Sequence, residues 1–123
     1  MPAVRAAIDV AGLAGVLTDV GVAMATTGRH RTLARYELSL TAVRDPELRA
    51  ELVSGGDTIR RLGATSLRAL GATEPAAAAG ELAAALDGLV FTALVRGPYD
   101  PTALAVWLRP ALARVLRAQP GVS

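Results

Sequence analysis

An Asp-Pro-Glu break at residues 45–47 constrains the fold more than any other short segment of this sequence. Before the break, apolar residues recur every three or four positions, which predicts a helix with one apolar side. Asp45 can cap a following helix, because its carboxylate accepts hydrogen bonds from the free N–H groups of the first turn. Pro46 fits the first helical position, where its missing N–H costs nothing. The break therefore predicts a tight corner between two packed helices.

The same Asp-Pro pair recurs at residues 100–101, and Pro75 marks a further helix start. Alanine and leucine dominate the composition and favour helices, whereas the residues that favour strands are few apart from valine. The 123 residues are enough for one domain with a single core but not for two. The sequence therefore predicts an all-α helical bundle in one domain, residues 1–123. The expected helices span about residues 2–25, 32–44, 46–70, 74–95 and 101–118.

Composition excludes several classes of function. The thirteen basic residues are all arginine, but the net charge is only +2, which is a weak case for nucleic-acid binding. Without cysteine, the chain has no disulfides, thiolate chemistry or cysteine-based metal sites. Asp9 and Asp19 interrupt the stretch that a secretory signal would need to be apolar, and no uncharged stretch approaches the length of a membrane span. We therefore expect a soluble, cytoplasmic protein with no membrane contact.

The last two predicted helices are too apolar for a monomer of this size. Apolar residues nearly encircle the segment 81–95, and one broad apolar face runs along residues 104–115. A helix in that state is buried on more than one side. A second copy of the chain, related by a two-fold axis, is the simplest cover, and it would form a four-helix interface. The predicted interface comprises Leu82, Leu86, Leu89, Ala93, Leu104, Trp107, Leu108 and Ala111.

Three segments resemble a known family. They are ARYELSLTAVRDPELRAEL (34–52), AALDGLVFTALV (84–95) and LAVWLRPALARVLRA (104–118). They are similar to the C-terminal regulatory domain of TetR-type transcriptional repressors, over roughly residues 32–118. The resemblance implies a homodimer formed by the last two helices, and a small-molecule pocket among the middle helices.

The sequence departs from that family in one respect. TetR-type repressors bind DNA through an N-terminal helix-turn-helix, and no such run precedes Val4. Three explanations stay open: a truncated gene product, a mis-started reading frame, or a separate effector domain. We expect DNA binding only through a helix-turn-helix that is not present in this chain.

Candidate pocket residues have two interpretations. The apolar and aromatic side chains on the middle helices could line a ligand cavity, but the same spacing is typical of an ordinary core. The sequence offers no clear polar anchor, so it does not identify a ligand. The candidates are Tyr36, Leu40, Ile59, Leu62 and Phe91.

Few residues point to other chemistry. His30 is the only histidine, and without a second ligand nearby we expect no metal site. Arg29, Arg31 and Arg35 could bind an anion or a phosphate backbone, although an exposed charged turn is the more common explanation. Asp87 lies within an apolar run and could face either an arginine across the interface or a solvated edge. No nucleophile–base pair or phosphate loop is visible, so we expect neither an enzyme nor a cofactor.

The sequence thus favours a TetR-type regulatory domain that dimerises and can bind a small apolar effector. One alternative is a stand-alone helical interaction protein that heterodimerises with a full-length repressor. A helical enzyme is a third option, which the absent catalytic residues argue against.

Overall fold

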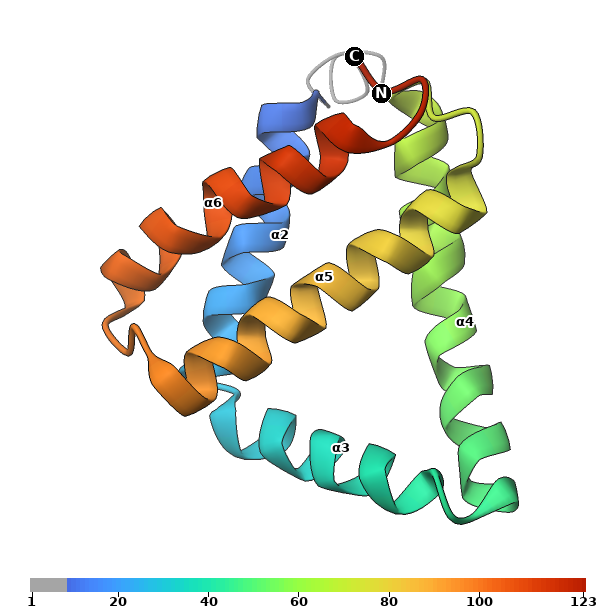
Figure 1. Cartoon of the computed structure of the whole chain (residues 1–123), viewed down its shortest axis with the longest axis vertical. Coiled ribbons are helices and arrows are strands. Elements are labelled where there is room, and N and C mark those ends of the chain that lie inside the picture. The colour runs from blue at the N-terminus through green and yellow to red at the C-terminus, as the bar shows by residue number, and fades with distance from the viewer. Residues whose placement is uncertain (1–8) are drawn as a thin grey trace.

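A computed structural model describes residues 9–123 of the chain, which are almost entirely helical (Figure 1). The all-α bundle expected from the sequence is confirmed, and residues 9–123 contain no strand. The helices are α2 (Val10–Ala25), α3 (Arg29–Ala42), α4 (Pro46–Ala69), α5 (Pro75–Arg96) and α6 (Pro101–Ala118).

Both Asp-Pro pairs start helices as expected. Asp45 begins α4 and Asp100 begins α6, and each carboxylate accepts from the backbone N–H three residues further on, at 3.2 and 2.9 Å. A proline occupies the first turn of each helix. These caps satisfy N–H groups that have no partner within the helix, so the helix boundaries follow from local chemistry.

The first described helix begins later than the sequence predicts. Asp9 has an extended backbone, with φ −123° and ψ −178°, and its carboxylate accepts from the N–H of Gly12 at 2.7 Å. This N-cap fixes the start of α2 at Val10, so the predicted helix 2–25 is not continuous through Asp9. Residues 2–8 of that prediction lie outside the described residues.

The corner between α2 and α3 is shorter than expected. Only residues 26–28 form the turn, and α3 already begins at Arg29. The hydroxyl of Thr32 donates to the carbonyl of Gly28 at 3.0 Å, which places this threonine in the first turn of the helix. The predicted start at residue 32 is therefore three residues late.

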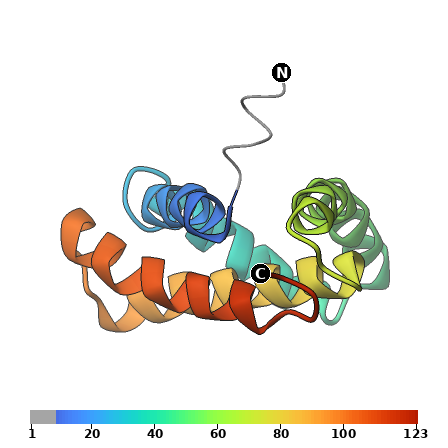
Figure 2. The same cartoon turned by 90° about the horizontal axis from the view of Figure 1, so that it is seen from above.

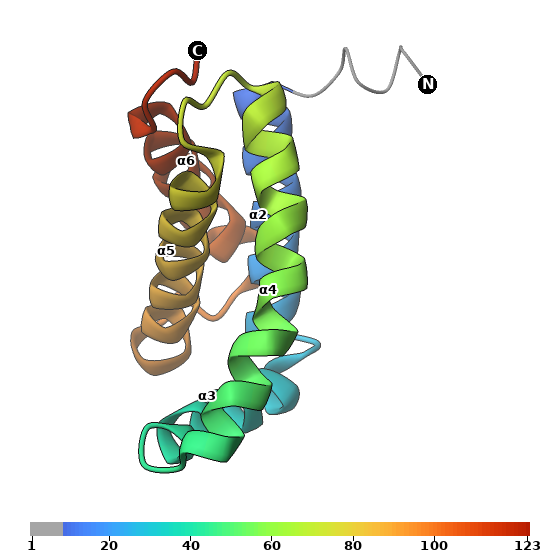
Figure 3. The ribbon, with the colours of Figure 1, turned by 90° about the vertical axis from the view of Figure 1, so that its right-hand side faces the viewer.

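The helices form two layers (Figures 2 and 3). Helices α5 and α6 make up one layer, and both α2 and α4 lie on the same side of it. Helix α2 packs mainly on α6, and α4 packs mainly on α5. Within the described part of the chain α2 and α4 do not contact each other, and α3 connects them at one end (Figure 1).

The tightest packing lies between α2, α5 and α6. Four leucines on α6 are at most 1% exposed, at positions 104, 108, 112 and 116. Gly21 lets α2 approach closely, because a Cβ there would lie 3.0 Å from Leu108 Cδ1 and 3.2 Å from Leu86 Cδ1. The buried hydroxyl of Thr18 donates to the carbonyl of Ala14 at 2.7 Å, so its polar group is satisfied inside this core.

The C-terminal tail lies against the turn between α4 and α5. The N–H of Thr73 donates to the carbonyl of Pro120 at 2.9 Å. Gly71 and Gly121 face each other with φ of +94° and +86°, a conformation that favours glycine. A Cβ on Gly71 would lie 2.7 Å from the carbonyl oxygen of Gly121, so the approach requires a residue without a side chain. The tail thereby ties the end of α6 to the end of α4.

Candidate effector-binding and dimerisation surfaces

A polar and aromatic group joins α3 to α5. We define the α3–α5 cluster as Arg35, Tyr36, Asp87 and Phe91. A nitrogen of the Arg35 guanidinium lies 3.0 Å from Asp87 Oδ1, and the Tyr36 hydroxyl donates to the same oxygen at 3.2 Å. The guanidinium carbon of Arg35 stands 4.9 Å from the centre of the Tyr36 ring. The rings of Tyr36 and Phe91 are 6.1 Å apart and tilted by 59°, within the range of favourable aromatic pairs.

Asp87 has its cationic partner within its own chain. The sequence left open an arginine across an interface or a solvated edge. In the structure Arg35 of the same chain is the partner, and the two side chains are 44% and 49% exposed. An ion pair this exposed contributes at most about 1 kcal/mol. It therefore orients α3 against α5 more than it stabilises the fold.

Burial raises the pKa of the Tyr36 hydroxyl to about 12. The negative charge of Asp87 acts in the same direction, and the positive charge of Arg35 opposes it. The hydroxyl is therefore neutral at physiological pH and available as a hydrogen-bond donor. This favours its bond to the Asp87 carboxylate.

The predicted pocket residues separate into two groups. Tyr36 and Phe91 lie in contact within the α3–α5 cluster. Leu40 on α3 and Ile59 and Leu62 on α4 are instead exposed, at 67–72% of their surface. The described residues form no single enclosed cavity that holds all five.

A shallow hollow, largely open to solvent, lies at the corner between α3 and α4. Of the predicted pocket residues it contains only Leu40. Val43 also lines the hollow. It belongs to the apolar helical stripe before Asp45, but it was not among the predicted pocket residues. The lining residues are Leu40, Thr41, Val43 and Arg44.

Half of the predicted dimer residues lie in the core of the chain itself. Leu82, Ala93, Leu104 and Leu108 are all buried, the last with no exposed surface. These four side chains are therefore packed within the chain itself. Helical spacing identified an apolar face correctly but did not reveal that α2 and α4 cover it. The other four, Leu86, Leu89, Trp107 and Ala111, are half-buried.

A different apolar face is open on α5. We define the α5 stripe as Ala84, Gly88, Phe91 and Val95, which recur at helical spacing and are all exposed. Phe91 and Val95 are 55% and 59% exposed. Val106 on α6 and Tyr99 in the connecting loop are exposed as well. The sequence showed apolar residues nearly encircling the segment 81–95, but the predicted interface did not include Ala84, Phe91 or Val95.

Helix α5 also bears on the question of membranes. Within residues 9–123 it is the one single helix long and apolar enough to cross a bilayer, with a mean hydropathy of 1.6 over eighteen residues. The core helix of a soluble protein passes the same criterion. Helices α2 and α3 pass it only as a pair, and they are bent by 87° relative to each other. Helix α5 packs against α2, α4 and α6, and 33% of the apolar window is buried inside the chain.

The remaining candidate residues form no metal cluster. No group of three or more histidine, cysteine or acidic residues converges within the described residues. His30 is exposed near the start of α3. Arg31 is exposed and Arg29 is half-buried, and no carboxylate within the described range lies within 4 Å of either.

Comparison with known proteins gives one match. A sequence family described as "Tetracyclin repressor-like, C-terminal domain" matches residues 8–118, a range that includes every helix described above. No curated protein and no solved structure matches the chain.

Proposed function

The chain belongs to the tetracyclin repressor-like C-terminal domain family, and from this premise we propose that it is the dimerising and effector-binding domain of a transcriptional regulator. Domains of this family are regulatory, which favours this role over a stand-alone interaction protein. We expect it to act in the cytoplasm as a homodimer. DNA binding would require a helix-turn-helix of the kind that TetR-type repressors carry.

The observation that best supports dimerisation is the open α5 stripe. Its two large members, Phe91 and Val95, are 55% and 59% exposed, and Tyr99 in the loop that follows α5 is exposed as well. A two-fold axis would place this face against its copy and form a four-helix interface. A stable interface of this kind buries at least about 1,000 Å² in total. The buried leucines of α5 and α6 would then support the interface from behind without contributing to it.

The exposed leucine and isoleucine side chains of α3 and α4 support an apolar effector. Leu40, Ile59 and Leu62 are 67–72% exposed in the isolated chain. A small apolar molecule bound at Leu40, or at Ile59 and Leu62, would remove part of this surface from water. Each Å² of apolar surface removed from water contributes about 25 cal/mol. Leu40 also borders the hollow at the α3–α4 corner.

Phe91 gives a physical route from effector to dimer. Its ring contacts Tyr36 on α3, and it also belongs to the α5 stripe. An effector that binds better to one position of α3 favours that position, and the change reaches α5 through the Tyr36–Phe91 contact. In a complete regulator, a shift between the two copies would alter the spacing of the DNA-binding domains.

Dimerisation is tested by placing a charge on the open face. Ala84→Arg and Val95→Arg, both on the α5 stripe, should each convert a dimer into a monomer at micromolar concentration, because a buried unpaired charge is strongly unfavourable. Light scattering after size exclusion gives the mass, and circular dichroism checks that the helices remain. Val16→Arg is the matched control, since Val16 is 60% exposed on α2, away from this face. A monomeric wild type, or dimers in both variants, would contradict the proposal.

Effector binding is tested by thermal unfolding with a library of small apolar molecules. A ligand that binds only the folded chain raises Tm. At a ligand concentration of about a hundred times Kd, it stabilises the folded state by about 2.7 kcal/mol. Ile59→Asp and Leu62→Asp should reduce the shift. Val53→Asp is the control, because it introduces the same charge at another exposed position on α4. A library without a single stabilising compound would leave only the dimerisation role.

A further inference from the structure

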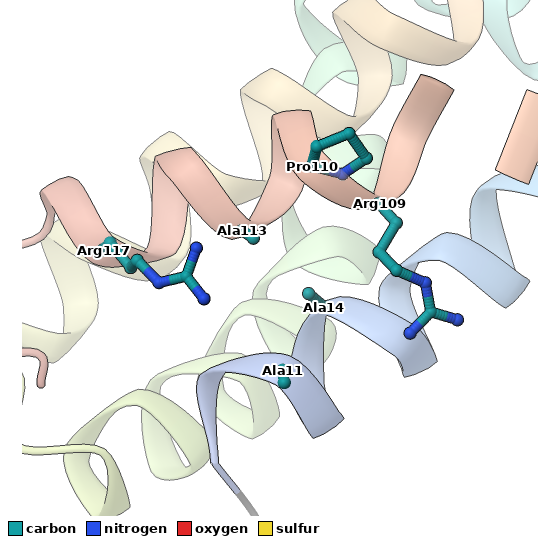
Figure 4. A pocket seen from close by; sticks show the side chains of 6 residues that line it. All are labelled: Ala11, Ala14, Arg109, Pro110, Ala113 and Arg117. Carbon is teal, nitrogen blue, oxygen red and sulfur yellow. The ribbon is translucent and has the colours of Figure 1, made fainter. Parts of the chain in front are cut away.

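A second hollow, apart from the surfaces described above, lies between α2 and α6 (Figure 4). Its volume is about 210 Å³. It is bordered by the first turns of α2 and by the C-terminal half of α6. The lining residues are Ala11, Ala14, Arg109, Pro110, Ala113 and Arg117.

The floor of this hollow is apolar and small. Ala11 and Ala14 come from α2, and Ala113 faces them from α6 (Figure 4). Their short side chains leave room that larger residues would fill. The floor can contact a short hydrocarbon segment of a ligand. It has no polar side-chain group that could bind a ligand's charge.

Two guanidinium groups supply the polar part of the hollow. Arg109 and Arg117 are eight residues apart, which is roughly 12 Å along the axis of α6. Figure 4 shows the Arg109 side chain extending across α2. The guanidinium lies close to the α2 backbone there, since a Cβ on Gly15 would be 3.2 Å from Arg109 Nη1. Arg109 and Arg117 thus flank the alanine floor.

Neither arginine is neutralised by the described residues. The Arg35–Asp87 pair is the one ion pair within residues 9–123, so no carboxylate there lies within 4 Å of Arg109 or Arg117. Asp9, the acidic residue closest to Ala11 in sequence, caps α2 by accepting from the N–H of Gly12. The hollow therefore combines an apolar floor with two positive charges that have no partner.

We propose that this hollow binds a small organic dianion with an apolar body. Guanidinium groups bind carboxylates and phosphates through paired, charge-assisted hydrogen bonds. Two negative charges on the ligand would balance the two arginines, and its methylene groups would lie on the alanines. A dicarboxylate carries its charges at both ends, whereas an alkyl phosphate carries them at one end. Both have the chemistry that the hollow recognises.

Isothermal titration of the complete chain tests this with four probes. Octanedioate should bind at least about tenfold more tightly than octanoate, because it engages one more guanidinium. The neutral diol of the same length should not bind measurably. Hexyl phosphate distinguishes the two charge arrangements. If hexyl phosphate binds more tightly than octanedioate, both arginines bind one end of the ligand. If it binds more weakly, the two arginines bind opposite ends. Higher salt should weaken the binding of either dianion, since the hollow is open to solvent.

Variants decide whether binding occurs in this hollow. Arg109→Gln and Arg117→Gln should each weaken octanedioate at least about fivefold, through the loss of one charged contact. Arg114→Gln is the matched control, because it removes the same charge from the same helix outside the hollow. Ala11→Leu should weaken binding as well, because Ala11 is exposed and a larger side chain would occupy the floor. Circular dichroism confirms that each variant is folded.

Three results would overturn the proposal. The first is that neither dianion binds. The second is that the diol binds as tightly as octanedioate. The third is that Arg114→Gln weakens octanedioate binding as much as Arg109→Gln and Arg117→Gln do. The site is independent of the proposed effector surface, so Leu62→Asp should leave octanedioate binding unchanged. Failure of the effector screen would therefore not affect this result.

Discussion

The α2–α5–α6 core and the α3–α4 arm use their apolar residues in opposite ways. In the core, leucines on α6 lose essentially all contact with water. In the arm, Leu40, Ile59 and Leu62 keep most of their surface exposed. Both sets recur at helical spacing, so the contrast arises from what packs against each helix. The comparison indicates that the core carries the stability of the chain, whereas the arm presents surface for recognition.

The C-terminal part of α4 packs on α5, whereas α3 and the N-terminal half of α4 are held at few places. Thr32 and Ala42 are the buried residues of α3, and Leu67 is the one buried residue of α4. Leu67 lies near the end of α4, where Gly63 comes close to Ala79 of α5. The α3–α5 cluster is the second attachment. No residue of α3, and none of α4 before Ala64, belongs to the main apolar core, which leaves room for α3 to respond to a ligand.

Leucine truncation gives the largest expected contrast between the two regions. Leu108→Ala should lower the free energy of unfolding by about 3 kcal/mol, because it leaves a cavity in a fully buried site. Leu62→Ala removes the same atoms from an exposed position and should change it by less than about 0.5 kcal/mol. Chemical denaturation monitored by circular dichroism measures both. Similar losses in the two variants would mean that the arm is covered in solution, for example by a partner.

Glycine substitutions should have opposite signs in the two regions. A Cβ at Gly21 would press on the buried Leu108, so Gly21→Ala should destabilise by about 1 kcal/mol despite its better helix propensity. Gly55 lies in α4 with nothing within 4 Å of an added Cβ. Gly55→Ala should therefore stabilise the chain by up to about 1 kcal/mol. Thermal unfolding measures both changes. Stabilisation by both alanines would show that the contact at Gly21 is loose.

The smallest expected effect concerns the attachment of the arm at high pH. The folded pKa of Tyr36 is about 12 against an ordinary value of 10.0, so the neutral hydroxyl is favoured in the folded chain. The contribution of the neutral Tyr36 hydroxyl to the free energy of unfolding is fully present below pH 10 and is lost as the pH rises towards 12. Because the Tyr36 side chain is only half-buried, this contribution is reduced. Tyr36→Phe should show a shallower loss of stability than wild type across this window. Parallel pH profiles would contradict the assigned burial of the hydroxyl.

Local chemistry made the fold predictable. The Asp45 and Asp100 caps and the prolines after them mark helix starts that need no knowledge of the rest of the chain. The starts of α2 and α3 were less predictable. Asp9 was not recognised as a cap, and the glycine at position 28 and the arginine that follows it gave no strong start signal.

The surfaces could not be predicted to the same degree. Leu104 and Leu40 have the same helical periodicity, yet one is buried and the other exposed, because burial depends on which helices lie over them. The ion pair of Arg35 with Asp87 joins residues 52 positions apart, which no local pattern encodes. The hollow between α2 and α6 likewise depends on how two distant helices pack.

Hydrogen exchange of the backbone amides, resolved by helix, tests the contrast between core and arm most directly. The opening free energy of a segment follows the packing that must be broken to expose it. We predict the slowest exchange in α2, α5 and α6, with opening energies close to that of global unfolding. Helix α3 and the N-terminal half of α4 should exchange at least about tenfold faster. Equal protection throughout, or the strongest protection in α3 and the N-terminal half of α4, would contradict the division into a stable core and a responsive arm.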